Sequence, residues 1–132
     1  MVINGVNLPD IDVADALVME RYEHAHDNVA KAMNDLQPEG KRQSELIRAQ
    51  CTAVFNFFDE VFGDGTAKKV FGETVNLTPC INAYEDVIKA VNAFGSKLGS
   101  MYKSRANVIN NHRGKKHKQY NHYKKTLKPA TK

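Results

Sequence analysis

The chain lacks the sequence patterns that mark membrane and secreted proteins. It contains no tryptophan among its 132 residues. It also has no run of about eighteen apolar residues, the length that a membrane-spanning helix needs. Its first residues, Met1-Val2-Ile3-Asn4-Gly5, lack the basic start and the long apolar stretch of a secretory signal. We therefore expect a protein that stays in the cytoplasm of the cell that makes it.

Cysteine is scarce as well. Cys51 and Cys80 are the two cysteines, and both have apolar neighbours in the sequence. In a reducing compartment, isolated cysteines behave as small apolar side chains. The sequence therefore predicts two buried thiols and no disulfide.

Patterns that hold metals, cofactors or catalytic groups are also missing. His24 and His26 are two residues apart on an expected helix, so they point to different sides, and His112, His117 and His122 stand without a metal-binding motif. Neither a P-loop nor a GxGxxG pattern occurs. Adjacent carboxylates are present, but neighbouring positions on a helix diverge, and no nucleophile is placed beside a base. We expect no metal, no cofactor and no enzymatic activity.

No acidic residue follows Asp86, so charge is divided sharply along the chain. Residues 1–96 hold eight basic and fifteen acidic residues, a net charge of −7. Residues 97–132 hold eleven basic residues and no acidic one. This asymmetry indicates an acidic folded part and a basic segment that seeks polyanions or acidic protein surfaces.

Hydrophobic periodicity predicts a mainly α-helical fold. Helices are expected over residues 13–36, 42–62 and 79–98, with a short helical turn between the last two. Ahead of them, Asn4-Gly5 is typical of a tight hairpin turn, so the first twelve residues are expected to form an extended ribbon.

The third helix has the clearest start and the weakest end. Thr78 fits its N-cap and Pro79 its first helical position. Gly95 and Gly99 weaken the helix, and the apolar pattern fails after about residue 104. The sequence therefore predicts a helical domain over residues 1–104 and a basic tail over 105–132, which is expected to be disordered alone.

The apolar faces of the three helices predict the core. Residues that share those faces and are expected to be buried are Leu17, Val29, Met33, Ile47, Cys51, Val54, Phe58, Ile81, Tyr84, Ile88 and Val91. The region between Val54 and Phe71 is unusually aromatic for a body this small. Most of it must be core, but we expect Phe57, Val70 and Phe71 to remain at the surface for a partner.

Basic and aromatic residues are interspersed in the tail. Basic side chains there would follow phosphates while tyrosines stack on bases, which is one interpretation of the segment. The other interpretation is a solubilising arm, or one that docks on an acidic protein. The candidate polyanion-binding residues are Arg113, Lys115, Lys116 and Lys118.

Several stretches of the chain resemble a known family. They are Phe57-Phe58-Asp59-Glu60-Val61-Phe62-Gly63-Asp64-Gly65-Thr66, Val70-Phe71-Gly72, Asn76-Leu77-Thr78-Pro79-Cys80, Ile3-Asn4-Gly5-Val6, Leu8-Pro9-Asp10-Ile11-Asp12 and Tyr22-Glu23. Over about residues 3–94 the chain resembles the tail assembly chaperones of long-tailed bacteriophages and prophages of Gram-positive bacteria.

The resemblance implies a mostly helical, non-catalytic protein of the host bacterial cytoplasm that is absent from the mature virion. Such chaperones bind the tape-measure protein, keep its long helices soluble and help recruit tail-tube subunits. Self-association is a further expectation. The residues leave a second function class open, namely a nucleic-acid-binding protein of a phage or mobile element that acts through its basic C-terminal tail.

Overall fold

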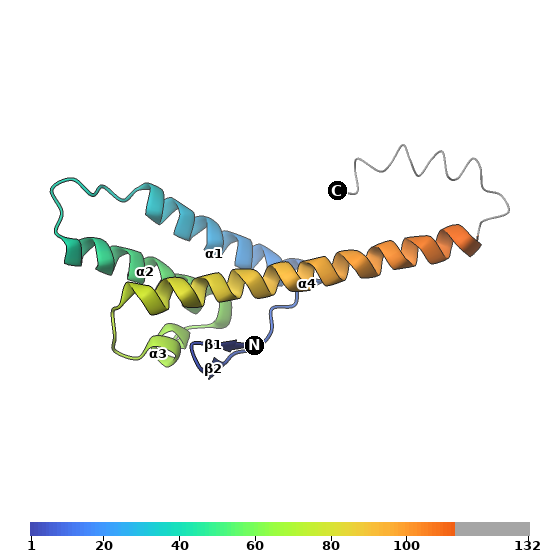
Figure 1. Ribbon diagram of the computed structural model, residues 1–132, viewed down its shortest axis with the longest axis horizontal. Helices are drawn as coiled ribbons and strands as arrows, with labels where there is room; N and C mark the ends of the chain where they lie inside the picture. The colour runs from blue at the N-terminus through green and yellow to red at the C-terminus, as the bar shows by residue number, and fades with distance from the viewer. Residues whose placement is uncertain (113–132) are drawn as a thin grey trace. The chain divides into compact units, whose positions relative to one another are not determined.

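Four helices and a two-stranded ribbon form the part of the chain that the structure describes. The computed structural model describes residues 1–112, and the side chains of residues 1–110. The elements follow the order β1 (Val2–Ile3), β2 (Val6–Asn7), α1 (Ala16–Asn34), α2 (Gln43–Phe62), α3 (Thr66–Phe71) and α4 (Leu77–His112) (Figure 1). The predicted mainly helical class with an N-terminal ribbon is confirmed. Within residues 1–112, no helix is long and apolar enough to cross a membrane.

The chain divides into two compact units, residues 1–94 and residues 95–132. The first unit holds the ribbon, α1 to α3 and the first part of α4, and the described part of the second unit is the remainder of α4. This division lies ahead of the boundary expected after residue 104. The last buried apolar side chain among the described residues is Val91, so the core ends early along α4.

The N-terminal ribbon forms as the sequence predicts. Val2 pairs with Asn7 and Ile3 with Val6 in an antiparallel register. Asn4 and Gly5 turn the chain with positive φ angles of 51° and 77°, a conformation that asparagine and glycine tolerate best. The Asn4 amide donates a 2.8 Å hydrogen bond to the backbone carbonyl of Val70, which ties the ribbon to α3.

Helices α1 and α2 pack against each other as an antiparallel hairpin (Figure 1). Asp15 caps α1, because its side chain accepts hydrogen bonds from the backbone N–H groups of Leu17 and Val18. Tyr22, Ala25 and Val29 are the buried side chains of this helix. The expectation that Leu17 is core is wrong: its side chain is 71% exposed, because one position before Val18 it has turned about 100° away from the buried stripe.

The family-resembling motif between α2 and α3 forms a tight corner. Gly63 ends α2 at φ 110°, and Gly65 precedes α3 at φ 89°, both in a region that favours glycine. The Thr66 hydroxyl donates to the Gly63 carbonyl at 2.7 Å. The Ala67 backbone N–H donates to the Asp59 carboxylate at 2.8 Å, which satisfies a free donor at the start of α3. The motif therefore has a structural role in this fold.

Helix α4 is longer than the sequence predicts. The Asn76 side chain accepts the backbone N–H of Thr78 at 3.1 Å, so Asn76 takes the capping position expected for Thr78. At the other end the helix continues to His112, whereas its pattern was expected to fail near residue 104. Glycine in a helix costs only about 1 kcal/mol relative to alanine. Gly95 and Gly99 therefore weaken α4 without ending it.

The core of the first unit is built around the α2 phenylalanines. Phe57 contacts Tyr22 of α1 and Tyr84 of α4 edge-to-face, with ring centroids 6.0 Å and 4.9 Å apart. Phe58 packs against Phe71 of α3 at 5.3 Å. Edge-to-face pairs are each worth about 0.5–1.5 kcal/mol beyond the area they bury. One helix thus connects three others through two adjacent rings.

Candidate functional site

The residues that we expected to offer a partner surface are buried. Phe57 is 1% exposed, Val70 4% and Phe71 6%, so their assignment to an exposed surface is wrong. Phe57 lies off the centre of the α2 stripe, but α1 and α4 flank α2 and both contribute a tyrosine against this ring. The candidate polyanion-binding residues, Arg113, Lys115, Lys116 and Lys118, lie outside the described residues.

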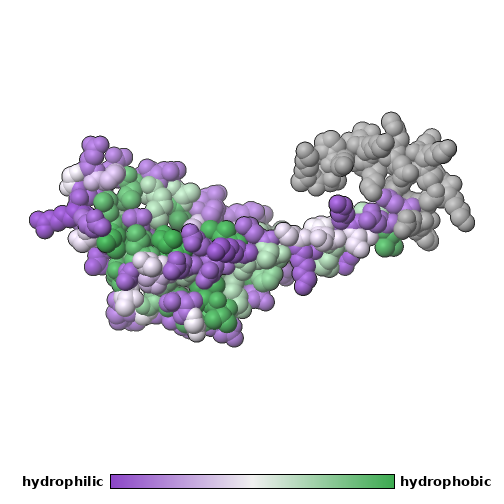
Figure 2. Space-filling view, viewed as in Figure 1, coloured by the Kyte–Doolittle hydropathy of each residue, from purple (hydrophilic) through white to green (hydrophobic). Residues whose placement is uncertain are grey.

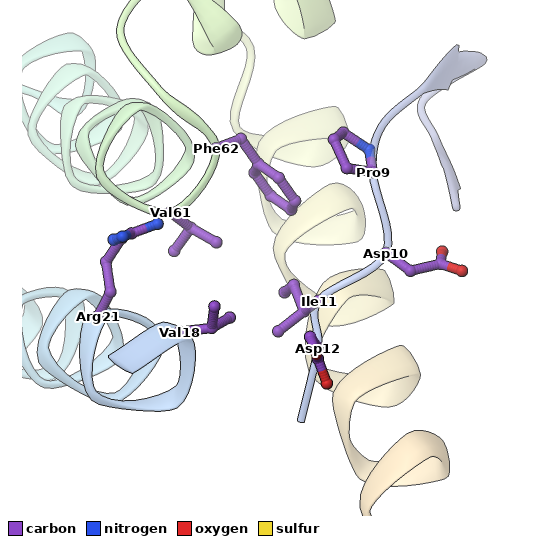
Figure 3. A pocket seen from close by; sticks show the side chains of 8 residues that line it. All are labelled: Pro9, Asp10, Ile11, Asp12, Val18, Arg21, Val61 and Phe62. Carbon is purple, nitrogen blue, oxygen red and sulfur yellow. The ribbon is translucent and has the colours of Figure 1, made fainter. Parts of the chain in front are cut away.

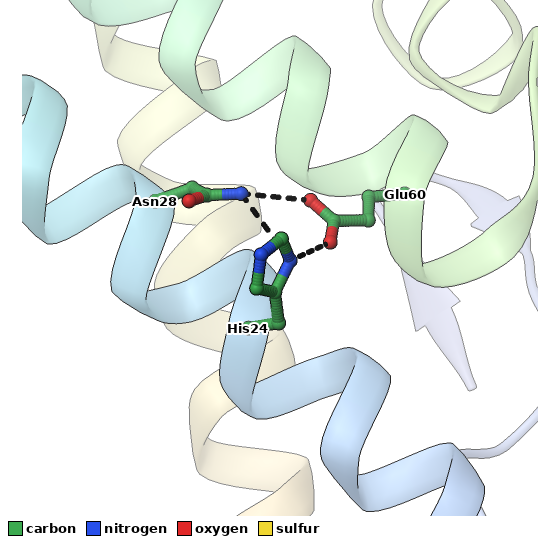
Figure 4. Close-up of polar contacts among 3 residues, drawn as sticks. All are labelled: His24, Asn28 and Glu60. Carbon is green, nitrogen blue, oxygen red and sulfur yellow. Dashed lines mark hydrogen bonds and ion pairs between the residues drawn. The ribbon is translucent and has the colours of Figure 1, made fainter.

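A polar cluster joins α1 to α2 at the surface (Figure 4). His24 Nδ1 lies 2.5 Å from Glu60 Oε2, and Asn28 Nδ2 donates to Glu60 Oε1 at 3.2 Å. The hydrogen bond to Glu60, followed by the charge of that carboxylate, raises the pKa of His24. The His24 side chain is 69% exposed, so solvent screens the ion pair and the cluster is a surface link between helices.

His26 makes a second link, between α1 and α4. Its ring stacks between Tyr22 and Tyr84, with centroids 6.1 Å and 5.8 Å away. Its Nδ1 lies 2.5 Å from the Tyr84 hydroxyl. Burial, and then the proximity of Tyr22, raises the pKa of Tyr84 to about 12, so this hydroxyl stays protonated at neutral pH while it is hydrogen-bonded to the imidazole. The expectation that His24 and His26 point to different sides is confirmed.

The two cysteines are free and buried, as predicted. Cys51 lies in α2 and Cys80 in the first turn of α4, where each is at most 1% exposed. Burial, followed by a hydrogen bond to the Cys51 thiol, raises the pKa of Cys80 to about 12. A thiol that keeps its proton is a poor nucleophile. Across the described residues, no group of three or more His, Cys, Asp or Glu side chains could hold a metal ion.

A shallow hollow lies between the segment after β2 and the ends of α1 and α2 (Figure 3). Its volume is about 240 Å³, below the roughly 300–1,000 Å³ of most small-molecule sites. The close-up shows Ile11, Val18 and Phe62 turned toward the hollow, while the Asp10 carboxylate points away from it. The side chains that this view shows turned into the hollow are therefore apolar. The residues that line it are Pro9, Asp10, Ile11, Asp12, Val18, Arg21, Val61 and Phe62.

Apolar side chains gather differently on the second part of α4. On the visible face of residues 1–94, hydrophobic and hydrophilic side chains are interspersed (Figure 2). Within residues 95–110, four large apolar side chains are largely exposed: Met101 by 44%, Tyr102 by 57%, Val108 by 64% and Ile109 by 48%. We call this set the α4 stripe, and it consists of Leu98, Met101, Tyr102, Arg105, Val108 and Ile109.

Sequence reasoning did not assign the α4 stripe to a site, although the signal was present. Leu98, Met101 and Tyr102 continue the phase of the core-facing side of the helix, and Val108 and Ile109 extend it. Gly95 and Gly99 instead favoured the prediction that the helix ends in this region. The stripe is the exposed feature of the described chain with the clearest capacity to bind another molecule, because it combines regular apolar spacing with a basic side chain at Arg105.

No curated protein and no solved structure matches the chain. One family model does, under the description "Family of unknown function (DUF6673)", and it covers residues 4–126. That range includes the ribbon from Asn4 onward, all four helices and part of the basic segment. Because the model matches nearly the whole chain, the protein belongs to the family of unknown function DUF6673.

Proposed function

We propose that this protein is a non-catalytic tail assembly chaperone of a long-tailed bacteriophage or prophage. In this role it binds the tape-measure protein in the host bacterial cytoplasm, helps to recruit tail-tube subunits and leaves before the virion is complete. The proposal rests on the resemblance carried by residues 3–94. Much of the sequence that carries this resemblance forms the corner between α2 and α3. The resemblance therefore supports a fold shared with those chaperones, and we infer the function from that fold.

The observation that carries the proposal furthest is the exposed α4 stripe. A chaperone that keeps long helices apart must cover their apolar faces, and one helix covers another through side chains spaced by three and four residues. The α4 stripe offers that spacing on a helix of 36 residues. Phe57 and Phe71 lie in the core, so we assign binding of the tape-measure protein to α4 and not to these residues.

Co-expression tests the proposal directly. The full chain, expressed with the tape-measure protein of the same phage, should increase the fraction of the tape-measure protein that remains soluble. The two proteins should then elute together in size-exclusion chromatography. A folded wild-type chain that leaves the solubility of the tape-measure protein unchanged would refute the chaperone function.

The charge of the C-terminal part favours one second candidate, a nucleic-acid-binding protein. Residues 97–132 carry eleven basic and no acidic residues. Binding through such a segment releases counterions, so affinity for a generic duplex should fall by orders of magnitude between about 50 mM and about 200 mM salt. Gel retardation at both concentrations measures this fall. Absence of retardation at the lower concentration would remove this candidate.

A further inference from the structure

We propose that the α4 stripe is a docking site for an acidic amphipathic helix of a partner protein. The inference deepens the proposed function, on which it rests for the place of that partner in tail assembly. The site itself rests on the spacing, exposure and charge of residues 97–109.

The spacing of the stripe is that of a helix-pairing seam. Leu98, Met101, Arg105 and Val108 are separated by three, four and three residues, which is the a/d pattern of a coiled coil. Tyr102 and Ile109 follow Met101 and Val108 and widen the same face. A face this wide is typical of a helix that packs against another element.

The composition of this part of α4 indicates that its helix gains stability from a partner. Residues 95–112 include Gly95 and Gly99, together with three serines and three asparagines, which are modest helix formers. A Cβ added at either glycine would meet no atom within 4 Å, so no close contact within the chain requires glycine there. In proteins, most of the stability of a helix comes from the packing of its amphipathic face. Covering the stripe would supply that packing.

The charge of the stripe selects an acidic partner. Arg105 lies in the middle of the apolar face and Lys97 at its edge, and no acidic residue occurs from Gly95 onward. A second copy of the same helix would bring like charges together, which disfavours self-pairing. A helix with glutamate or aspartate beside its apolar face would pair with both cations.

The position of Arg105 also argues against the two other polyanions, membranes and nucleic acids. A bilayer would have to bury this guanidinium among acyl chains, which is costly, whereas a carboxylate on a partner helix can meet it. Phosphates of a nucleic acid would satisfy Arg105 but leave Val108 and Ile109 in water. A protein helix covers both the charge and the apolar side chains.

A pair of designed peptides tests the inference on the full-length chain. The probe is a fluorescent helical peptide of about four heptads with leucine at its a and d positions and glutamate on both flanks. The control peptide carries lysine in place of glutamate. Anisotropy should show the acidic peptide binding at least about tenfold more tightly than the basic one, a difference of about 1.4 kcal/mol. Binding should weaken as salt is added.

Matched variants locate the site. Met101→Asp should weaken binding of the acidic peptide at least about tenfold. Ser100→Asp makes the same charge change on the opposite side of the helix, and it should change the affinity for that peptide by no more than about twofold. The double variant Lys97→Glu with Arg105→Glu should reverse the preference and bind the lysine peptide. This reversal gains binding, so it does not depend on a variant that fails to fold.

Defined results would overturn the inference. Equal binding of the two peptides by the wild-type chain would do so, as would equal losses for Met101→Asp and Ser100→Asp. The wild-type chain could instead bind phosphatidylserine vesicles or a generic duplex, lose that binding in Met101→Asp, and fail to bind the acidic peptide. That result would assign the stripe to a membrane or to nucleic acid. The tape-measure protein takes no part in these measurements. Failure here therefore leaves the co-expression result standing, and peptide binding without an effect on the tape-measure protein would reject the proposed function alone.

Discussion

The Tyr84 hydroxyl is hydrogen-bonded to Nδ1 of His26 across 2.5 Å, and this bond joins the first part of α4 to α1. The two rings are also stacked, with an interplanar angle of 16°. The partners are 58 residues apart in sequence, so the pair is a long-range contact that holds two distant segments of the chain together.

Removing the hydroxyl of Tyr84 should lower stability while leaving the core packed. Tyr84→Phe keeps the ring that contacts Phe57 but leaves His26 without this hydrogen-bond partner. A hydrogen bond of this kind contributes about 0.5–1.5 kcal/mol, and urea unfolding should show a loss in that range. Tyr102→Phe is the matched control, because Tyr102 is 57% exposed and should show no measurable change. Equal midpoints for the two variants would count against the bond.

Truncating Leu17 and truncating Phe58 should have very different effects on stability, although the sequence places both residues on apolar faces. Phe58 is fully buried, and Phe58→Ala should cost about 3–5 kcal/mol, a large part of the stability of a small domain. Leu17→Ala should change stability by less than about 0.5 kcal/mol, because its side chain lies in solvent. Chemical denaturation of both variants measures the difference. A costly Leu17→Ala would show that this side chain is packed in solution.

The His24–Glu60 link should make stability depend on pH. The pKa of His24 is raised in the folded chain above its ordinary value of 6.5. The folded state therefore holds this proton more tightly than the unfolded state does. The stabilisation is complete below pH 6.5 and is lost as pH rises through the higher folded value.

Urea midpoints between pH 5 and 8 should reveal this effect by difference. The advantage of the wild type over Glu60→Gln should be present at the acidic end and shrink as pH rises. The difference should be small, because the His24 side chain is largely exposed. An advantage that grows toward pH 8 would contradict the sign of the shift.

The thiols should resist modification until the chain unfolds. Burial keeps both cysteines from solvent, and the raised pKa of Cys80, about 12, leaves almost no thiolate at neutral pH. A thiol reagent such as DTNB should react with neither cysteine in the native protein and with both in denaturant. Rapid reaction of one equivalent under native conditions would show that the first turn of α4 opens readily.

Short-range signals in the sequence predicted the elements well. Asn4-Gly5 specifies its own turn, and the three-and-four spacing of apolar residues defines each helix without reference to the rest of the chain. The same spacing does not say how wide the buried face of a helix is, because that width depends on how many neighbours pack against it. Phe57 is buried because two helices flank α2, and a sequence pattern for α2 alone carries no information about either.

The long-range contacts could not be predicted from the sequence for the same reason. His26 is four residues from Tyr22, which places both on one face of α1, yet nothing in the sequence indicates that Tyr84 completes the stack. The end of α4 was missed because glycine was given more weight than the continuing apolar period. The polar links and the α4 stripe thus came from the structure, whereas the helical class and the ribbon came from the sequence.

The hydrogen bond from Asn4 to the Val70 carbonyl has a consequence for the order of folding. A two-stranded hairpin is marginal by itself in water, so β1 and β2 need the surface that α3 provides. The bond spans 66 positions, and the loop between its ends must close before the ribbon gains anything from it. Amide hydrogens of the ribbon should therefore gain protection late in refolding, after those of α1 and α2, which makes the ribbon a reporter of the completed helical body.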